Sequence, residues 1–143
     1  MSNRREFIKQ GTQASLGSCL ALSVFSSVFE SCKTAALTGL TIDENEISFH
    51  LSSFGSKKII FISDERLKDE VVIVKKKDGT YYAMKMQCTH QMNPVRYTGD
   101  SFFCPTHGST FDMEGKPTTA PAMRPLQRFT TIESGTRLIV KLT

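Results

Sequence analysis

The sequence predicts an all-β domain with an antiparallel framework and a loop-rich insertion. Short apolar or alternating segments follow one another after residue 42, and no window there shows a convincing helical period, apart from room for one short turn at 64–69. All five prolines fall between residues 90 and 126, so this stretch is expected to be mostly loops. Strands are expected at residues 46–51, 58–62, 71–74, 80–86, 127–132 and 136–142.

The outer strands are predicted from their patterns of side chains. Residues 46–51 alternate between polar and apolar side chains, whereas 58–62 is an apolar run typical of a buried strand. Residues 127–132 and 136–142 are expected to form a hairpin that turns at Glu133-Ser134-Gly135.

The clearest hairpin joins residues 71–74 to residues 80–86. Lysines and Asp78-Gly79 separate the two segments, and Asp-Gly is a strong turn signal between apolar strands. The run Lys75-Lys76-Lys77 is interpreted as the solvated end of the first strand. A nucleic-acid patch would need basic and aromatic residues interleaved on one face, so no nucleic-acid partner is expected.

Length and composition leave room for one domain and an N-terminal appendage. The chain has 143 residues, of which 22% are charged and 39% are hydrophobic, so disorder is not indicated. Its formal net charge of +4 is mild.

The N-terminus has the features of an export signal. The segment from Asn3 to Lys9, with its paired arginines Arg4 and Arg5, resembles the twin-arginine pattern. A moderately apolar stretch follows at residues 14–29, and its sixteen residues fall short of the roughly 20 that a spanning helix needs. Residues 1–31 are therefore predicted to be a twin-arginine-type signal or anchor segment.

Cys32 is a candidate for lipidation. It directly follows the apolar stretch, where a bacterial lipoprotein signal would be cleaved, although Glu30 is a poor residue within such a site. An uncleaved anchor is the alternative. Residues 32–41 are expected to be a linker, and residues 42–143 the folded domain.

Two mixed pairs of cysteine and histidine make up the candidate metal site. Cys88 and His90 form the first pair, and Cys104 and His107 form the second after thirteen intervening residues. Two such pairs are the ligand set of a Rieske-type [2Fe–2S] cluster, in which two histidines replace two cysteines on one iron. A structural zinc site stays open as an alternative, but zinc fingers usually pair cysteine with cysteine and histidine with histidine.

The motifs Cys88-Thr89-His90 and Cys104-Pro105-Thr106-His107-Gly108-Ser109-Thr110-Phe111-Asp112 resemble the two cluster loops of Rieske proteins. The resemblance covers residues 68–141. It implies stacked antiparallel sheets with a small cluster-binding subdomain at one end, at about 86–125, and one cluster per chain. It also implies that the two imidazoles face solvent at the tip of this subdomain. Residues 120–125, which include Pro121, resemble the loop that covers the cluster.

Three positions are informative against this family pattern. The resemblance places Asn93 and Thr106 where quinol-oxidising members carry a disulfide between the two loops. Ser109 matches a hydroxyl donor to the cluster, whereas Phe111 replaces a neighbouring tyrosine donor. Because donors stabilise the reduced cluster, the midpoint potential is expected to lie below that of the most oxidising members but above that of ferredoxin-like ones.

The function expected from the sequence is one-electron transfer in an exported, membrane-associated protein at the periplasmic or outer face of a bacterial membrane. A quinol-oxidising or other respiratory complex is the expected partner. The alternatives are a Rieske-type ferredoxin that donates to an oxygenase or oxidase, and a zinc-stabilised binding module. His50 is the only histidine outside the motif, too few for the second iron of an oxygenase, so the chain is not expected to be an oxygenase by itself.

Overall fold

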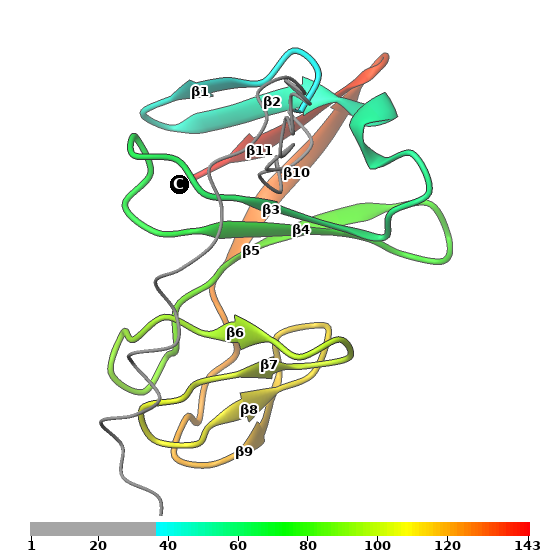
Figure 1. Ribbon diagram of the computed structural model, residues 1–143. Coiled ribbons are helices and arrows are strands. Elements are labelled where there is room, and N and C mark those ends of the chain that lie inside the picture. Colours follow the sequence, from blue (N-terminus) through cyan, green and yellow to red (C-terminus); the bar gives the residue numbers. More distant parts are fainter. Residues whose placement is uncertain (1–36) are drawn as a thin grey trace, which may run out of the picture. The chain divides into compact units, whose positions relative to one another are not determined.

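The computed structural model describes residues 37–143, and these residues confirm the all-β prediction (Figure 1). Their one short helical element is the 3₁₀ turn η1 (Leu51–Phe54), which the sequence pattern did not reveal. The strands are β1 (Thr41–Asp43), β2 (Glu46–His50), β3 (Ile59–Ile62), β4 (Val71–Lys75), β5 (Tyr81–Lys85), β6 (Arg96–Tyr97), β7 (Phe102–Phe103), β8 (Thr110–Phe111), β9 (Pro117–Thr119), β10 (Arg128–Ser134) and β11 (Arg137–Lys141).

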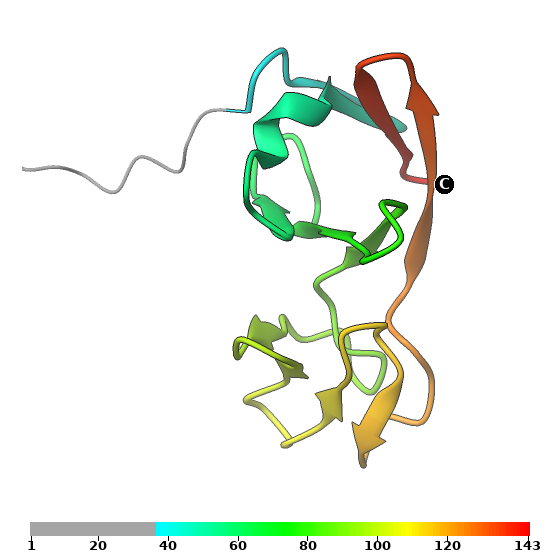
Figure 2. The ribbon, with the colours of Figure 1, turned by 90° about the vertical axis from the view of Figure 1, so that its right-hand side faces the viewer.

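Seven strands form one antiparallel sheet, which we call the base sheet. Its order is β1-β2-β11-β10-β5-β4-β3. Strand β10 joins the two halves, because Arg128 and Phe129 pair with β5 whereas residues 130–134 pair with β11. The sheet curls so that the halves face each other, as Figure 2 shows. Both halves contribute to one apolar core, with Phe49 and Leu138 from one half and Ile73 from the other.

The half formed by β3, β4 and β5 is apolar on both faces. Val71 and Ile73 of β4 point into the base core, whereas Val72 and Val74 belong to a second core on the opposite face. Side chains alternate across a strand, so a continuous apolar run is what a strand between two cores requires.

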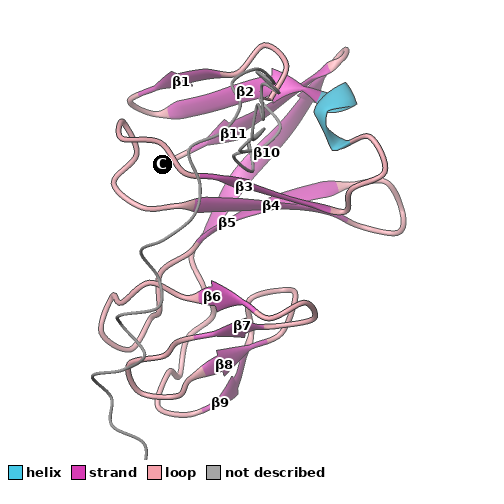
Figure 3. Cartoon of the chain, viewed as in Figure 1, coloured by secondary structure: helices cyan, strands magenta, loops and turns pink. Residues whose placement is uncertain are grey.

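The second core is shared with a smaller part of the chain at about 86–125, which we call the cluster-binding subdomain after the prediction made for it. Strands β6 to β9 form a separate four-stranded sheet there, in sequence order (Figure 3). Each of these strands has only two or three residues. The prediction of a stretch made mostly of loops therefore holds, although four short strands occur within it.

The N-terminal predictions concern residues that the structure does not describe. The predicted signal segment 1–31 and the lipidation candidate Cys32 both lie there. Thr41, at the end of the predicted linker, already belongs to β1. Within residues 37–143, none of the helices has the length and hydropathy to cross a membrane.

Candidate metal centre

The first candidate ligand loop connects β5 to β6 and closes on itself through backbone hydrogen bonds. The amide of Cys88 donates to the carbonyl of Asn93 at 2.7 Å, and the amide of Met92 donates back to the carbonyl of Cys88 at 2.9 Å. Met92 has a φ of 55°, in the left-handed region that side-chain-bearing residues rarely adopt. The loop is thus a tight turn that begins at a cysteine.

The second loop, between β7 and β8, repeats this backbone pattern at the same spacing. The amide of Cys104 donates to the carbonyl of Ser109 at 2.8 Å, and the amide of Gly108 donates to the carbonyl of Cys104 at 3.0 Å. Gly108, four residues after its cysteine like Met92, has a φ of 79°. The two loops are therefore two copies of one turn, each carrying a histidine two or three residues after its cysteine.

These turns point the thiols inward and the imidazoles outward. Cys88 and Cys104 each keep about 1% of their surface exposed and belong to the second core. His90 and His107 are exposed, and their ring centroids lie 5.0 Å apart with the rings edge to face. The exposed imidazoles agree with what the family resemblance implies for the tip.

The environment of Cys104 suits a thiolate ligand. Burial alone would raise the pKa of this thiol, but hydrogen bonds outweigh burial and lower it. The donors are the backbone amides of Thr106 and His107, the Thr106 hydroxyl and the Cys88 thiol. Both cysteines are free rather than joined to each other. Metal ligands must be deprotonated, so a lowered pKa favours metal binding.

The four candidate side chains form two pairs. Among residues 37–143, no three or more histidine, cysteine, aspartate or glutamate side chains converge on one point as ligands of a single ion would. Instead the two thiols meet in the core, and the two imidazoles meet at the surface. A Rieske cluster takes two cysteines at one iron and two histidines at the other, whereas a structural zinc ion takes four ligands around one centre. The pairing therefore fits a two-iron cluster.

A third loop, residues 120–125, is held against both ligand loops. The Thr89 hydroxyl donates to the carbonyl of Arg124 at 2.6 Å. The amide of Ala122 donates to the Ser109 hydroxyl oxygen at 3.0 Å. Pro121, half-buried, belongs to this loop, as the resemblance implies. The sequence does not predict this role of Thr89. Its only signal there is its position between Cys88 and His90.

The hydrogen bond to Ser109 leaves its hydroxyl proton available. A serine hydroxyl carries one donor and two acceptor positions, and Ala122 uses one acceptor. Ser109 is fully buried, and its amide-accepting hydroxyl keeps a proton that can donate to a group bound between the ligand loops. Phe111 is also fully buried in the second core and has no polar atom to donate.

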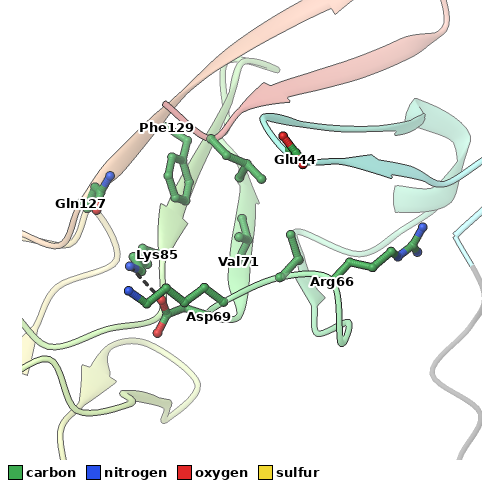
Figure 4. A pocket seen from close by; sticks show the side chains of 10 residues that line it. Glu44, Arg66, Asp69, Val71, Lys85, Gln127 and Phe129 are labelled. Carbon is green, nitrogen blue, oxygen red and sulfur yellow. Dashed lines mark ion pairs between the residues drawn. The ribbon is translucent and has the colours of Figure 1, made fainter.

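One cavity of the domain lies apart from the candidate ligands. A cavity of ≈ 280 Å³ on the base sheet is lined by residues that include Glu44 and Phe129 (Figure 4). There the Lys85 amine lies 2.8 Å from the Asp69 carboxylate, as the dashed line marks. No thiol or imidazole lines this cavity. His50 also lies apart from the loops, at the end of β2 in the base sheet.

Comparison with known proteins gives three results. The family model described as Rieske [2Fe-2S] domain matches residues 50–130. Carotenoid phi-ring synthase of Chlorobaculum tepidum is 32% identical over 71 residues, which are 48% of this chain and 11% of that protein. This chain thus spans about a tenth of the length of that relative. The crystal structure of the cyanobacterial plasma membrane Rieske protein PetC3 from Synechocystis PCC 6803 is 27% identical, with a TM-score of 0.54 over 71% of this chain and 99% of that one.

Proposed function

Because the chain belongs to the Rieske [2Fe–2S] family and carries one such cluster, we propose that Cys88 and Cys104 bind one iron while His90 and His107 bind the other. The observation that carries this assignment is the pairing of buried thiols with exposed imidazoles on two copies of one turn. With this cofactor, a zinc-stabilised module is no longer the competing explanation of the motif.

The bound cluster supplies one-electron redox chemistry, and the surrounding residues set where the electron passes and at what potential. The exposed imidazoles give the electron a route to the surface, because the thiolate side is enclosed by the second core. The amides of Thr106 and His107 donate to the Cys104 sulfur on this side. The Ser109 hydroxyl oxygen accepts the Ala122 amide, and its own proton is proposed to donate to the bound cluster. Such donors stabilise the added negative charge of a reduced cluster.

The proposed partner docks over the imidazoles. Met92 and Met123 are two of the large apolar side chains that stand exposed, at 59% and 83%, and both lie on loops around the tip. Flexible methionine side chains suit an adaptable contact surface. Within the loops at 88–93, 104–109 and 120–125, Arg124 is the only lysine, arginine, aspartate or glutamate. Docking is therefore expected to depend little on salt.

The proposed setting is an exported, membrane-associated protein that serves a quinol-oxidising or other respiratory complex. The twin-arginine-type segment supports export, and the similarity to a plasma membrane Rieske protein supports the membrane. A Rieske-type ferredoxin is the second candidate, favoured by Asn93 and Thr106 where a loop-bracing disulfide would stand. Changing both Arg4 and Arg5 to lysine should leave the holoprotein in the cytosolic fraction if the segment directs export.

Electron paramagnetic resonance and potentiometry of the holoprotein test the proposed site. The reduced protein should give the spin signal of a histidine-ligated [2Fe–2S] cluster, and His107→Ala should abolish it. Phe111→Tyr should raise the midpoint potential by about 40 mV, since a donor worth about 1 kcal/mol more in the reduced state shifts a one-electron couple by that amount. Ser109→Ala should lower it by a similar amount. A spin-silent protein would contradict the ligand assignment, and unchanged potentials would contradict the donor argument.

A further inference from the structure

Five lysines gather at one end of the base sheet, and we call them the lysine cluster: Lys57, Lys58, Lys75, Lys76 and Lys77. They come from two segments that antiparallel pairing brings together. Strand β3 pairs with β4, and the amide of Lys75 donates to the carbonyl of Lys58 at 2.9 Å. With Gly55 and Ser56 the five side chains line a hollow of ≈ 290 Å³. The cluster is thus one surface rather than two separate runs.

Neighbouring acids neutralise the positive charge of the lysine cluster only in part, through the interaction of Asp78 with Lys76. The ion pairs found within residues 37–143 involve other cations, and none includes a member of the lysine cluster. Asp78 is the only acidic residue in segments 55–58 and 75–80, and its carboxylate accepts the Thr80 amide at 2.9 Å and the Thr80 hydroxyl at 2.6 Å. Four of the five lysines are exposed.

The lysine cluster lies at the far end of the fold from the candidate ligands. Strand β5 begins at Tyr81, which pairs with Lys75, and ends at Lys85, three residues before Cys88. The four rises between Tyr81 and Lys85 amount to about 14 Å, so the lysine cluster and the first ligand loop lie at opposite ends of β5. Figure 1 shows the β4–β5 turn on one side of the molecule and the loop that leaves β5 on the other.

We propose that the lysine cluster binds the anionic headgroup surface of a phospholipid membrane. Lysine is a flexible point charge, and several lysines near an anionic bilayer attract it additively without a shaped pocket. A protein interface usually has a core of apolar and aromatic side chains. The large apolar side chains exposed within residues 37–143 are Met92, Met123 and Ile132, and all three belong to other segments. Such binding leaves the imidazole tip free for a redox partner.

Vesicle binding of the full-length holoprotein tests this surface. Partition into vesicles of phosphatidylcholine with 30% phosphatidylglycerol is compared with partition into phosphatidylcholine alone. The triple variant Lys57→Gln, Lys58→Gln, Lys77→Gln retains the two lysines that lie over tyrosine rings, Lys75 over Tyr81 and Lys76 over Tyr82. Each lysine near an anionic surface is worth about fivefold in partition. The triple variant should therefore lose at least about 10-fold of the preference for anionic vesicles.

A charge-matched variant separates the lysine cluster from net charge. Lys68→Gln, Arg96→Gln and Lys116→Gln together remove three exposed positive charges from other segments, and this variant should lose less than about threefold. The wild type and both triple variants keep the N-terminal arginines and the four proposed ligands of the [2Fe–2S] cluster. The spin signal of the reduced protein should therefore be equal in all three. Equal losses in the two triple variants, or no loss in either, would overturn the proposal. If neither variant loses the preference for anionic vesicles, an acidic protein would be the remaining candidate ligand of the lysines. The membrane setting comes from the proposed function, but this experiment measures the lysine surface independently of the redox partner.

Discussion

The base sheet and the cluster-binding subdomain are both antiparallel, but they are held together differently. Strands β10 and β11 pair over five positions, and so do β4 and β5. In the subdomain, β6 pairs with β7 over only two positions. The base sheet is thus stabilised by long backbone ladders around an apolar core, whereas the subdomain has few ladder bonds and many turns. The difference indicates that the subdomain needs stabilisation from outside its own backbone.

Two sources supply that stabilisation. One is the outer face of the base sheet, because Val72 and Met84 pack in the same core as Phe102 and Phe111 of the subdomain. The other is the proposed bound cluster, since both cysteine ligands belong to this core and metal binding contributes directly to folding free energy. The base core itself contains no subdomain residue, whereas the subdomain has no core without the outer face of β4 and β5.

The largest expected effect comes from removing a proposed ligand. Cys104→Ser should eliminate the [2Fe–2S] absorbance and spin signal, and amide exchange should become fast throughout residues 86–125. The base sheet should keep its slow exchange, because its ladders and core do not involve the ligands. Hydrogen exchange with residue-level readout measures both regions in one experiment.

Cys32→Ser is the matched control, since Cys32 precedes the described residues 37–143 and is not a proposed ligand, so the [2Fe–2S] cluster should stay in place. If Cys104→Ser unfolds the base sheet as well, the two regions form one cooperative unit and the comparison fails. If exchange in residues 86–125 stays slow, the subdomain does not need the cluster for its stability.

This contrast also explains what the sequence could predict. Six of the seven base strands, all except β1, and the four candidate ligands follow from local signals: periodicity, an Asp-Gly turn and two mixed Cys–His pairs. The strands β6 to β9 could not be predicted, because segments of two or three residues are too short to show a period. The lysine cluster was also missed. Lys75-Lys76-Lys77 was visible as a run, but Lys57 and Lys58 join it only through the pairing of β3 with β4.

A smaller effect is expected where the two regions touch, at Gly115. A Cβ atom there would lie 2.6 Å from the Met84 sulfur of β5 and 3.2 Å from the Leu126 Cβ, and φ is +79°. Gly115→Ala should therefore lower the free energy of unfolding by about 2–4 kcal/mol, from overpacking together with left-handed backbone strain. Urea denaturation measures this change.

Gly79→Ala separates strain from packing. Gly79 has a φ of +89° in the β4–β5 turn, but a Cβ there would meet nothing within 4 Å. Its substitution should cost only about 1 kcal/mol, from strain alone. Equal losses at the two glycines would show that contact between the regions contributes nothing measurable.

The smallest expected effects are electrostatic and have opposite signs in the two places. Glu70, whose carbonyl accepts the amide of Met86 at the start of the subdomain, has its pKa raised above 4.5 by burial. Asp64, in the surface loop between β3 and β4, has its pKa lowered from 3.8 to about 2, chiefly by hydrogen bonds from Arg66. Because its pKa is raised, Glu70 contributes to folding stability below pH 4.5, and this contribution is lost as the pH rises through its folded-state pKa. Because its pKa is lowered, Asp64 contributes to folding stability above pH 3.8, and this contribution is lost as the pH falls toward about 2.

The amide variants should therefore shift Tm in opposite directions at pH 7. Glu70→Gln removes a charge that burial disfavours, so it should raise Tm at neutral pH and match the wild type below pH 4.5. Asp64→Asn removes the partner of Arg66, so it should lower Tm slightly at neutral pH, and the difference should vanish as pH approaches 2. Thermal unfolding followed by circular dichroism at several pH values measures both. If both variants shift Tm in the same direction, Glu70 at the junction with the subdomain is as solvated as Asp64 in the base-sheet loop. The contrast between the two regions would then rest on backbone pairing and packing alone.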